Sequence, residues 1–253
     1  MTRLMRRLVL PVVLLIVWEA WVRLAGNPRA PSPSSVVAAA GELLASGELV
    51  AGLATSIVRV FAGFAVASLV AIPLGLVMGA MRPVERNVDP LVETFRPVAA
   101  IAILPLVILW LGTGDFAAIA IVAYAAFFPV LINTITGVKT IEPSLLNAAR
   151  TMGISPFTRL RVVLLPAALP SILVGMRIGL GVAWTAIIAA ELAVGAKSGS
   201  NGGIGQMMFI LYAYSIKLSG IVVCMAAVGV VAFCLDRLVN LCLSFFVPWS
   251  RAQ

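Results

Sequence analysis

The chain has 253 residues, of which 62% are apolar and only 11% are charged, and it contains no histidine. Soluble domains carry about 25% charged residues, so this chain lacks the polar surface that a globule of its size needs, and it belongs to the membrane class. The missing histidine removes the commonest general base and metal ligand. The net charge is +8. The distribution of the basic residues along the chain fits the orientation of a membrane protein, so no nucleic acid partner is expected.

Six segments are long and apolar enough to cross a bilayer, which requires a helix of about 20 mostly apolar residues. The sequence therefore predicts an all-α membrane protein with about six transmembrane helices. The predicted spans are residues 8–25, 55–80, 90–111, 116–138, 167–192 and 216–246.

Residues 1–50 are predicted to hold the first span, a Pro-rich segment and a short surface helix, and residues 51–253 a five-helix core. The first span lacks a small-residue cleavage site before the Pro-rich segment, so an uncleaved helix is expected rather than a signal peptide. After the Pro- and Ser-rich segment, Ser34 or Ser35 is expected to cap a surface helix over residues 36–44.

The later connections are predicted from their proline, glycine and charge content. Residues 81–90, MRPVERNVDP, are expected to form a loop, and Pro97 and Pro105 punctuate the third span. Residues 194–208, VGAKSGSNGGIGQMM, are expected to form a loop or a re-entrant turn. In the second span, Gly75 and Gly79 form a small-xxx-small pair, which is typical of close helix packing.

Basic residues set the predicted orientation. With the amino terminus inside the cell, the larger share of the 18 basic residues lies on the cytoplasmic side, which is the side that Lys and Arg favour. This places both termini and the loop 139–166 in the cytoplasm of a multi-pass membrane protein. Asp236 and Arg237 lie roughly 30 Å along the sixth span, at a rise of about 1.5 Å per residue, which places them at the far membrane interface.

The loop 139–166 carries signals for two helices. Ser144 is expected to cap the first helix, in which Ala148 and Ala149 favour helix, and Gly153 to end it. Ser155 is expected to cap a second helix that starts at Pro156. These residues predict a helix–glycine–helix unit on the membrane surface, which is either a loop held to anionic lipid or a docking element.

The spacing inside this loop resembles a known family. Asn147-Ala148-Ala149, three residues, Gly153, nine residues and Val163-Leu164-Leu165-Pro166 resemble the "EAA" loop of permease subunits of bacterial ATP-binding-cassette (ABC) importers. Asn147 stands where that loop usually has Glu, and Val163 where it has Ile. The segments SIVRVFAGFAVASLVAIPLGLVMG, DPLVETFRPVAAIAILPLVILWLGTG and GGIGQMM are similar to the nitrate/sulfonate/taurine class, and the resemblance covers residues 50–250.

The resemblance implies the type I fold of ABC importer permeases, with cytoplasmic coupling helices. It also implies an importer that moves a small anion or organic acid, two ATPase subunits, a second copy of this permease, and a periplasmic or lipid-anchored solute-binding protein. The segment 142–166 is then the contact with the ATPase. The residues assigned to this contact are Asn147, Ala148, Ala149, Gly153, Ile154, Ser155 and Pro166.

No enzyme activity is expected in this chain. A phosphate-binding G-x-x-x-x-G-K-[ST] loop is missing, and so are G-x-S-x-G and, without histidine, H-E-x-x-H. Cys224, Cys234 and Cys242 are spaced for neither a zinc site nor a disulfide framework. We therefore expect no catalytic residue, no metal and no cofactor here, and ATP hydrolysis in a partner subunit.

Ionisable side chains inside spans are candidates for the transport pathway. Arg177 is placed to attract an anionic substrate, or else to pair with Glu191 or the backbone. Glu191 is expected to act as a gate or structural partner. Trp184 is either a cavity or a packing residue, and Arg59 and Arg96 are interfacial anchors or residues that steer anions.

Two other functions remain open at this stage. A stand-alone secondary transporter or channel would show inverted repeats and buried carboxylates, and the sequence shows no clear repeat. A membrane scaffold for a cytoplasmic enzyme is the second alternative.

Overall fold

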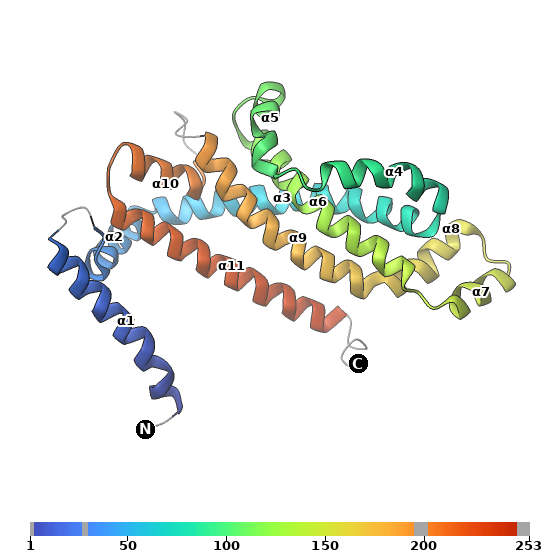
Figure 1. Ribbon diagram of the computed structural model, residues 1–253, viewed down its shortest axis with the longest axis horizontal. Coiled ribbons are helices and arrows are strands. Elements are labelled where there is room, and N and C mark those ends of the chain that lie inside the picture. Colours follow the sequence, from blue (N-terminus) through green and yellow to red (C-terminus); the bar gives the residue numbers. More distant parts are fainter. Residues whose placement is uncertain (1–2, 27–29, 195–201, 247–253) are drawn as a thin grey trace. The chain divides into compact units, whose positions relative to one another are not determined.

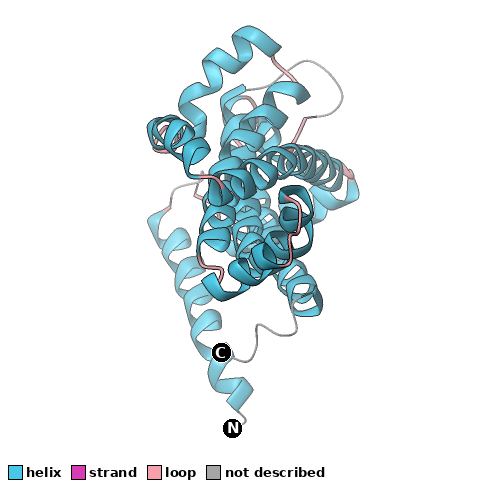
Figure 2. Cartoon of the chain, turned by 90° about the vertical axis from the view of Figure 1, so that its right-hand side faces the viewer, coloured by secondary structure: helices cyan, strands magenta, loops and turns pink. Residues whose placement is uncertain are grey.

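The computed structural model describes residues 3–26, 30–194 and 202–246, and every regular element in these ranges is helical (Figure 1 and Figure 2). This confirms the predicted all-α class, in which each helix satisfies its own backbone hydrogen bonds within lipid. The helices are α1 (Arg3–Ala25), α2 (Pro33–Ala45), α3 (Glu48–Ala80), α4 (Arg82–Phe95), η1 (Ala100–Ile103), α5 (Leu104–Leu111), α6 (Asp115–Lys139), α7 (Pro143–Thr151), α8 (Pro156–Arg159), η2 (Leu160–Leu164), α9 (Leu165–Val194), α10 (Ile204–Ala213) and α11 (Leu218–Phe246).

Within the described ranges, four helical stretches are long and apolar enough to cross a membrane. They match the second, fourth, fifth and sixth predicted spans and are Glu48–Ala80, Asp115–Lys139, Phe157–Ala193 and Leu218–Val239. The first predicted span is covered by α1, a single helix of 23 residues that is not among these four stretches.

The third predicted span is not one straight helix. The helices on either side of Pro97 are long and apolar enough to cross a membrane only when taken together, and they meet at an angle of 86°. Proline lacks the N–H that would continue the helix, and Ala99 is extended. The prediction of a loop over residues 81–90 is wrong: residues 82–95 form α4, whose Val92 is buried against the core. The proline and charges obscured a helical pattern in which valines recur every four residues, at Val84, Val88 and Val92.

The contacts of the chain divide it into two compact units. Unit 1 comprises residues 1–56 and 191–231, and unit 2 comprises residues 57–190 and 232–253.

In unit 2, glycines allow close packing of α3, α6 and α9. A Cβ on Gly75 would lie 2.7 Å from the Thr134 Cβ, and one on Gly79 would lie 2.6 Å from the Val138 Cβ. The predicted role of this glycine pair in close helix packing is confirmed. Contacts advance along α3 and α6 in the same direction, so these two helices are parallel.

On its other face, α6 packs against α9, with which it is antiparallel. A Cβ on Gly175 would lie 2.6 Å from the Asn133 Cβ, and one on Gly137 would lie 2.7 Å from the Ser171 Cβ. Because α3 and α6 run parallel, the chain between them must run back from the end of α3 to the level at which α3 began. The bent pair of α4 with η1 and α5 makes this return.

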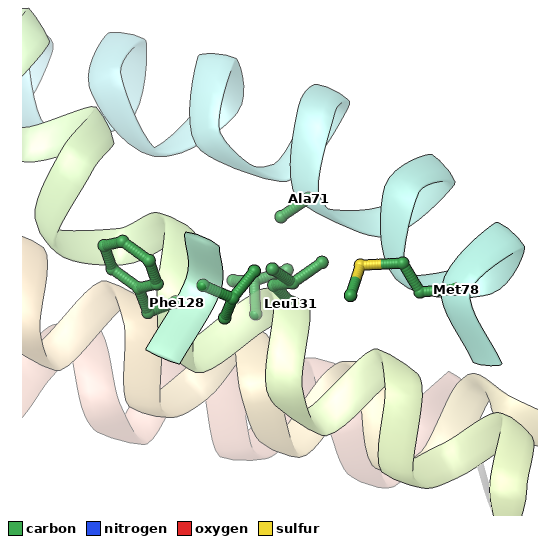
Figure 3. Close-up of a cluster of buried hydrophobic side chains, with 6 residues drawn as sticks. Ala71, Met78, Phe128 and Leu131 are labelled. Atoms are coloured by element: carbon green, nitrogen blue, oxygen red, sulfur yellow. The ribbon is translucent and has the colours of Figure 1, made fainter. Parts of the chain in front are cut away.

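The core of unit 2 lies between α3 and α6 (Figure 3). Ala71 and Met78 of α3 and Leu131 of α6 are fully buried there, and Phe128 is nearly so. Figure 3 shows these side chains in the space between the two helices. Tyr124 adds an edge-on contact to Phe128, with ring centroids 5.2 Å apart.

In unit 1, α2 begins at Pro33, three residues earlier than the predicted helix over residues 36–44. Its cap is Ser32 rather than Ser34 or Ser35: the Ser32 hydroxyl accepts the Ser35 N–H at 3.2 Å, and the Ser35 hydroxyl accepts the Ser32 N–H at 3.0 Å. Pro33 takes the first helical position, where its missing N–H costs nothing. The Ser34 hydroxyl instead donates to Glu19 at 3.0 Å.

The glycine-rich segment 194–208 is predicted as a loop or a re-entrant turn. Residues 195–201 lie outside the described residues, but α10 begins at Ile204, so the end of this segment is helical.

Candidate functional site

The predicted docking segment consists of a surface helix and a sharp turn. Helix α7 ends at Thr151, and Gly153 follows with φ of 67°, a left-handed conformation that glycine adopts without steric cost. Helix α8 then begins at Pro156, and the Ser155 hydroxyl accepts the Thr158 N–H at 3.2 Å. The predicted helix end and the predicted second cap are confirmed.

Ser144 does not cap the first helix. It lies inside α7, which begins at Pro143, and the Glu142 carbonyl accepts the N–H groups of Leu145 and Leu146 at 3.1 and 3.4 Å. Proline at the first helical position moves the start forward, because its fixed φ suits that position.

The second helix of this segment is not a separate surface element. It continues through η2 into α9, so residues 157–193 form one stretch. In η2 the backbone widens to a π-type turn, and the Leu165 N–H donates to the Leu160 carbonyl. This wider turn directly precedes Pro166 and explains how a continuous helix tolerates the proline ring.

The predicted docking segment packs on the core through one face and exposes large apolar side chains at its turn. Ile141 and Leu164 are buried in a cluster to which Leu146 also packs. In contrast, Met152 and Phe157, on either side of Gly153, are both 75% exposed. Of the residues assigned to docking, Asn147, Ala148, Gly153, Ser155 and Pro166 are exposed, Ile154 is half-buried and Ala149 is buried. Ala149 therefore packs inside this chain.

Arg96 lines a cavity of about 440 Å³ at the bend after α4. The Tyr124 hydroxyl donates to the Phe95 carbonyl at 2.7 Å and to the Val98 carbonyl at 3.3 Å, which fixes the bent backbone. The walls are mostly apolar, and Asn133 adds an amide from α6. An apolar cavity with a few polar groups is the usual form of a small-molecule site.

Arg177 forms an ion pair with Asp236, not with Glu191. Its Nε lies 2.8 Å from Asp236 Oδ1 and its Nη2 lies 3.2 Å from Oδ2, so α9 and α11 are joined by two parallel hydrogen bonds. Both side chains are 46% accessible. Trp184 lies near this pair, buried, and lines the same cavity of about 130 Å³. No local sequence pattern indicates this pairing, because its two residues are 59 positions apart.

Glu191 is only 2% exposed. Its carboxylate accepts the Ser56 hydroxyl at 3.0 and 2.9 Å and the Gly205 N–H at 3.0 Å, while the Ser56 hydroxyl accepts the Ile204 N–H at 2.9 Å. The first N–H groups of α10 are thus capped by side chains from α3 and α9, in keeping with the preference of helix amino termini for negative charge. The predicted alternative of a structural partner fits this geometry.

Arg59 is not an interfacial anchor. It is 7% exposed, and its Nη2 lies 2.6 Å from Oδ1 of Asp115, in the first turn of α6. Burial without a partner would be costly for a guanidinium, so this pair holds α3 to α6. The sequence feature that could have indicated this pair is the carboxylate of Asp115, which directly follows the Gly112-Thr113-Gly114 turn.

The arrangement of parallel and antiparallel helices with a protruding turn has a known counterpart. Residues 71–243 match the family of the binding-protein-dependent transport system inner membrane component. The chain belongs to this family. It is the permease subunit of an ABC importer and a multi-pass inner-membrane protein, and its family membership implies an ATPase partner and a substrate-binding protein.

Several named relatives are similar over most of the permease. A putative ABC transporter permease of Methanocaldococcus jannaschii is 38% identical over 92% of this chain and 88% of its own length. The taurine permease TauC of Escherichia coli is 36% identical over 78% of this chain and 70% of its own. The nitrate permease NrtB of Synechocystis is 32% identical over 97% and 90%. The permease thus falls in the nitrate/sulfonate/taurine class.

Solved structures share the fold. A chain of the MetNI methionine ABC transporter matches with a TM-score of 0.61 at 24% identity, over 76% of the permease and 94% of that chain. A chain of an amino acid ABC transporter matches with a TM-score of 0.60 at 16% identity, over 81% and 95%.

Proposed function

We propose that this permease forms the membrane pathway of an ATP-driven importer for a small oxyanion, such as nitrate, taurine or another sulfonate, and that the segment 142–166 couples it to a separate ATPase. The exposed turn at Gly153 is the observation that carries the proposal. The turn lies within the segment that resembles the family's docking motif, and it exposes the apolar side chains of Met152 and Phe157.

The physical argument for docking rests on Met152 and Phe157. Large apolar side chains that are three-quarters exposed gain free energy when a partner covers them, by about 25 cal/mol per Å² of apolar area. The segment around Gly153 carries a fixed backbone turn, so little conformational entropy is lost on docking. Because the chain continues from this turn directly into α9, a displacement of the turn would be transmitted to that helix.

The argument for an anion rests on relatives and on charge. Relatives of this chain are named for nitrate, taurine and aliphatic sulfonates. Arg96 supplies a guanidinium to the larger cavity, and a guanidinium binds oxyanions through paired N–H groups. We place Arg96 and Arg177 on the pathway and assign Trp184 to the wall of the smaller cavity, whereas Glu191 holds α10.

The proposed assembly contains two copies of this chain, two ATPase subunits and a solute-binding protein on the outer side. Both termini of the permease and the segment 142–166 lie in the cytoplasm. The proposed cycle opens the pathway outward when the ATPases bind ATP and close.

Transport in proteoliposomes tests the proposal. The permease would be purified with its ATPase and binding-protein partners, and uptake of radiolabelled taurine, nitrate and an alkanesulfonate would be measured with ATP or a non-hydrolysable analogue inside. Uptake that requires ATP, the ATPase and the binding protein is expected. Uptake by the permease alone, driven by an ion gradient, would overturn the proposal.

A further inference from the structure

The ion pair between Arg177 and Asp236 joins the membrane-spanning stretches Phe157–Ala193 and Leu218–Val239, with Asp236 near the end of the second stretch. Arg177 is in the middle third of α9, and Asp236 is in the second half of α11. Two parallel N–H···O contacts, at 2.8 and 3.2 Å, join the planar guanidinium to the planar carboxylate. This is the fork geometry in which arginine binds carboxylates and other oxyanions.

Helix packing alone does not require these charges. Charged side chains within membrane helices are costly, and an ion pair that is removed from water is often replaced by apolar residues without loss of stability. The neighbouring helices α6 and α9 pack closely through glycines instead, at Gly137 and Gly175. The charges of this pair therefore point to a ligand.

A cavity adjoins the pair. It has a volume of about 130 Å³ and is lined by Gly181, Trp184 and Thr185 from α9 and by apolar residues of α11. At Gly181 a Cβ would meet nothing within 4 Å, so the missing side chain widens the cavity one turn from Arg177. Drug-sized sites occupy roughly 300–1,000 Å³, whereas a water molecule takes about 30 Å³, so the cavity suits an anion of a few heavy atoms.

We propose that Arg177 is an oxyanion-binding residue and that Asp236 is its built-in counter-ion, which occupies the anion's position when cargo is absent. The ligand is a planar or tetrahedral oxyanion: nitrate, or the sulfonate or carboxylate head group of a small organic acid. Binding of the cargo displaces the Asp236 carboxylate from Arg177 and loosens the link between α9 and α11. This inference rests on the proposed transport of anions.

Anion binding to the whole permease–ATPase complex tests the inference. The complex would be placed in nanodiscs of phosphatidylcholine and titrated with methanesulfonate at constant ionic strength, with the tryptophan fluorescence as readout. Trp184→Phe should remove the signal while direct binding of radiolabelled methanesulfonate persists, since Trp184 reports on this cavity.

Asp236→Asn should raise the affinity for methanesulfonate by about tenfold, because the competing carboxylate is lost. The double variant Arg177→Gln with Asp236→Asn leaves no uncompensated charge, so it should assemble normally and lose binding. Glu85→Gln is the matched control: it removes a carboxylate from the pair with Lys139, which lies outside this cavity, and should leave the affinity unchanged.

Two results would overturn the inference. Equal affinity in wild type and the neutral double variant would show that the anion binds elsewhere. An unchanged or lower affinity in Asp236→Asn would show that the pair is only structural. A further arm replaces part of the phosphatidylcholine by phosphatidylglycerol; competition by this lipid in wild type would assign the site to lipid head groups and overturn the assignment to cargo.

The proposed function can fail separately. If the binding protein proves to carry a neutral or cationic cargo, the proposed anion transport is wrong even where methanesulfonate still binds at Arg177. If ATP-driven anion uptake is found but persists at wild-type KM in the neutral double variant, the inference about Arg177 is wrong and the proposed function stands.

Discussion

Substitution of Gly203 by alanine probes the buried carboxylate of Glu191. Gly203 has φ of −74° and ψ of 177°, which alanine adopts without strain. However, a Cβ at this position would lie 1.9 Å from Glu191 Oε1 and 2.2 Å from Cδ. The carboxylate must then move away from its hydrogen-bond donors, Ser56 and the Gly205 N–H.

The cost follows from those lost contacts. A hydrogen bond to a charged group contributes about 1.5–3 kcal/mol, and a buried group left unpaired costs more. Gly203→Ala should therefore lower the free energy of unfolding by about 2–5 kcal/mol, which corresponds to a decrease in Tm of roughly 10 °C. Gly52→Ala is the matched control, since its Cβ would meet backbone atoms at 3.6–3.7 Å, an ordinary contact distance, and should change Tm little.

A double-mutant cycle identifies the source of the cost. Thermal unfolding of the purified permease in detergent would be followed by size-exclusion chromatography for Gly203→Ala, Glu191→Ala and both together. Since Glu191→Ala removes the atoms that clash, Gly203→Ala should cost little in that background. An equal cost in both backgrounds, or none in wild type, would refute the reasoning.

Three other predictions concern packing and docking. Gly153→Leu should strain the left-handed turn by about 1–2 kcal/mol and reduce cargo-stimulated ATPase activity, whereas Gly153→Asn, which tolerates this conformation better, should retain most of it; equal activity in the two variants would argue against a role of the turn. Phe157→Ser should weaken binding of the ATPase by about tenfold if it is an interface anchor, as measured by co-purification over a range of ATPase concentrations, and undiminished binding would contradict the docking surface. Gly79→Ala should lower Tm, because its Cβ would lie 2.6 Å from the Val138 Cβ, while Gly229→Ala, where a Cβ meets nothing within 4 Å, should not; similar Tm values for both would exclude close packing as the cause.

The sequence predicted the features that depend on near neighbours in the chain. Hydrophobic length gave α3, α6, α9 and α11 to within a few residues, except for the start of α3, which lies seven residues earlier than predicted. The left-handed turn at Gly153 and the cap at Ser155 follow from local backbone preferences, and both are found. The small-xxx-small glycines predicted close packing in the same way.

Local signals also misled where two of them competed. In residues 81–90, proline and charge favour a loop, but the apolar face of α4 packs on the core and outweighs them. The predicted loop ends at residue 166 and the fifth span begins at residue 167, but the π-type turn before Pro166 keeps the helix continuous from residue 157.

Only the tertiary structure decided which polar side chains from distant parts of the chain contact one another. Arg177 meets Asp236 across 59 positions, Arg59 meets Asp115 across 56, and Glu191 meets Ser56 across 135. Hydrophobic length and local backbone preferences depend on residues within a turn or two, so the sequence by itself determined the long apolar helices, the membrane class and the left-handed turn at Gly153. Ion pairs and buried caps depend on the rotation and register of helices that pack from distant parts of the chain, and the glycine contacts that set this register become visible only once the helices are packed.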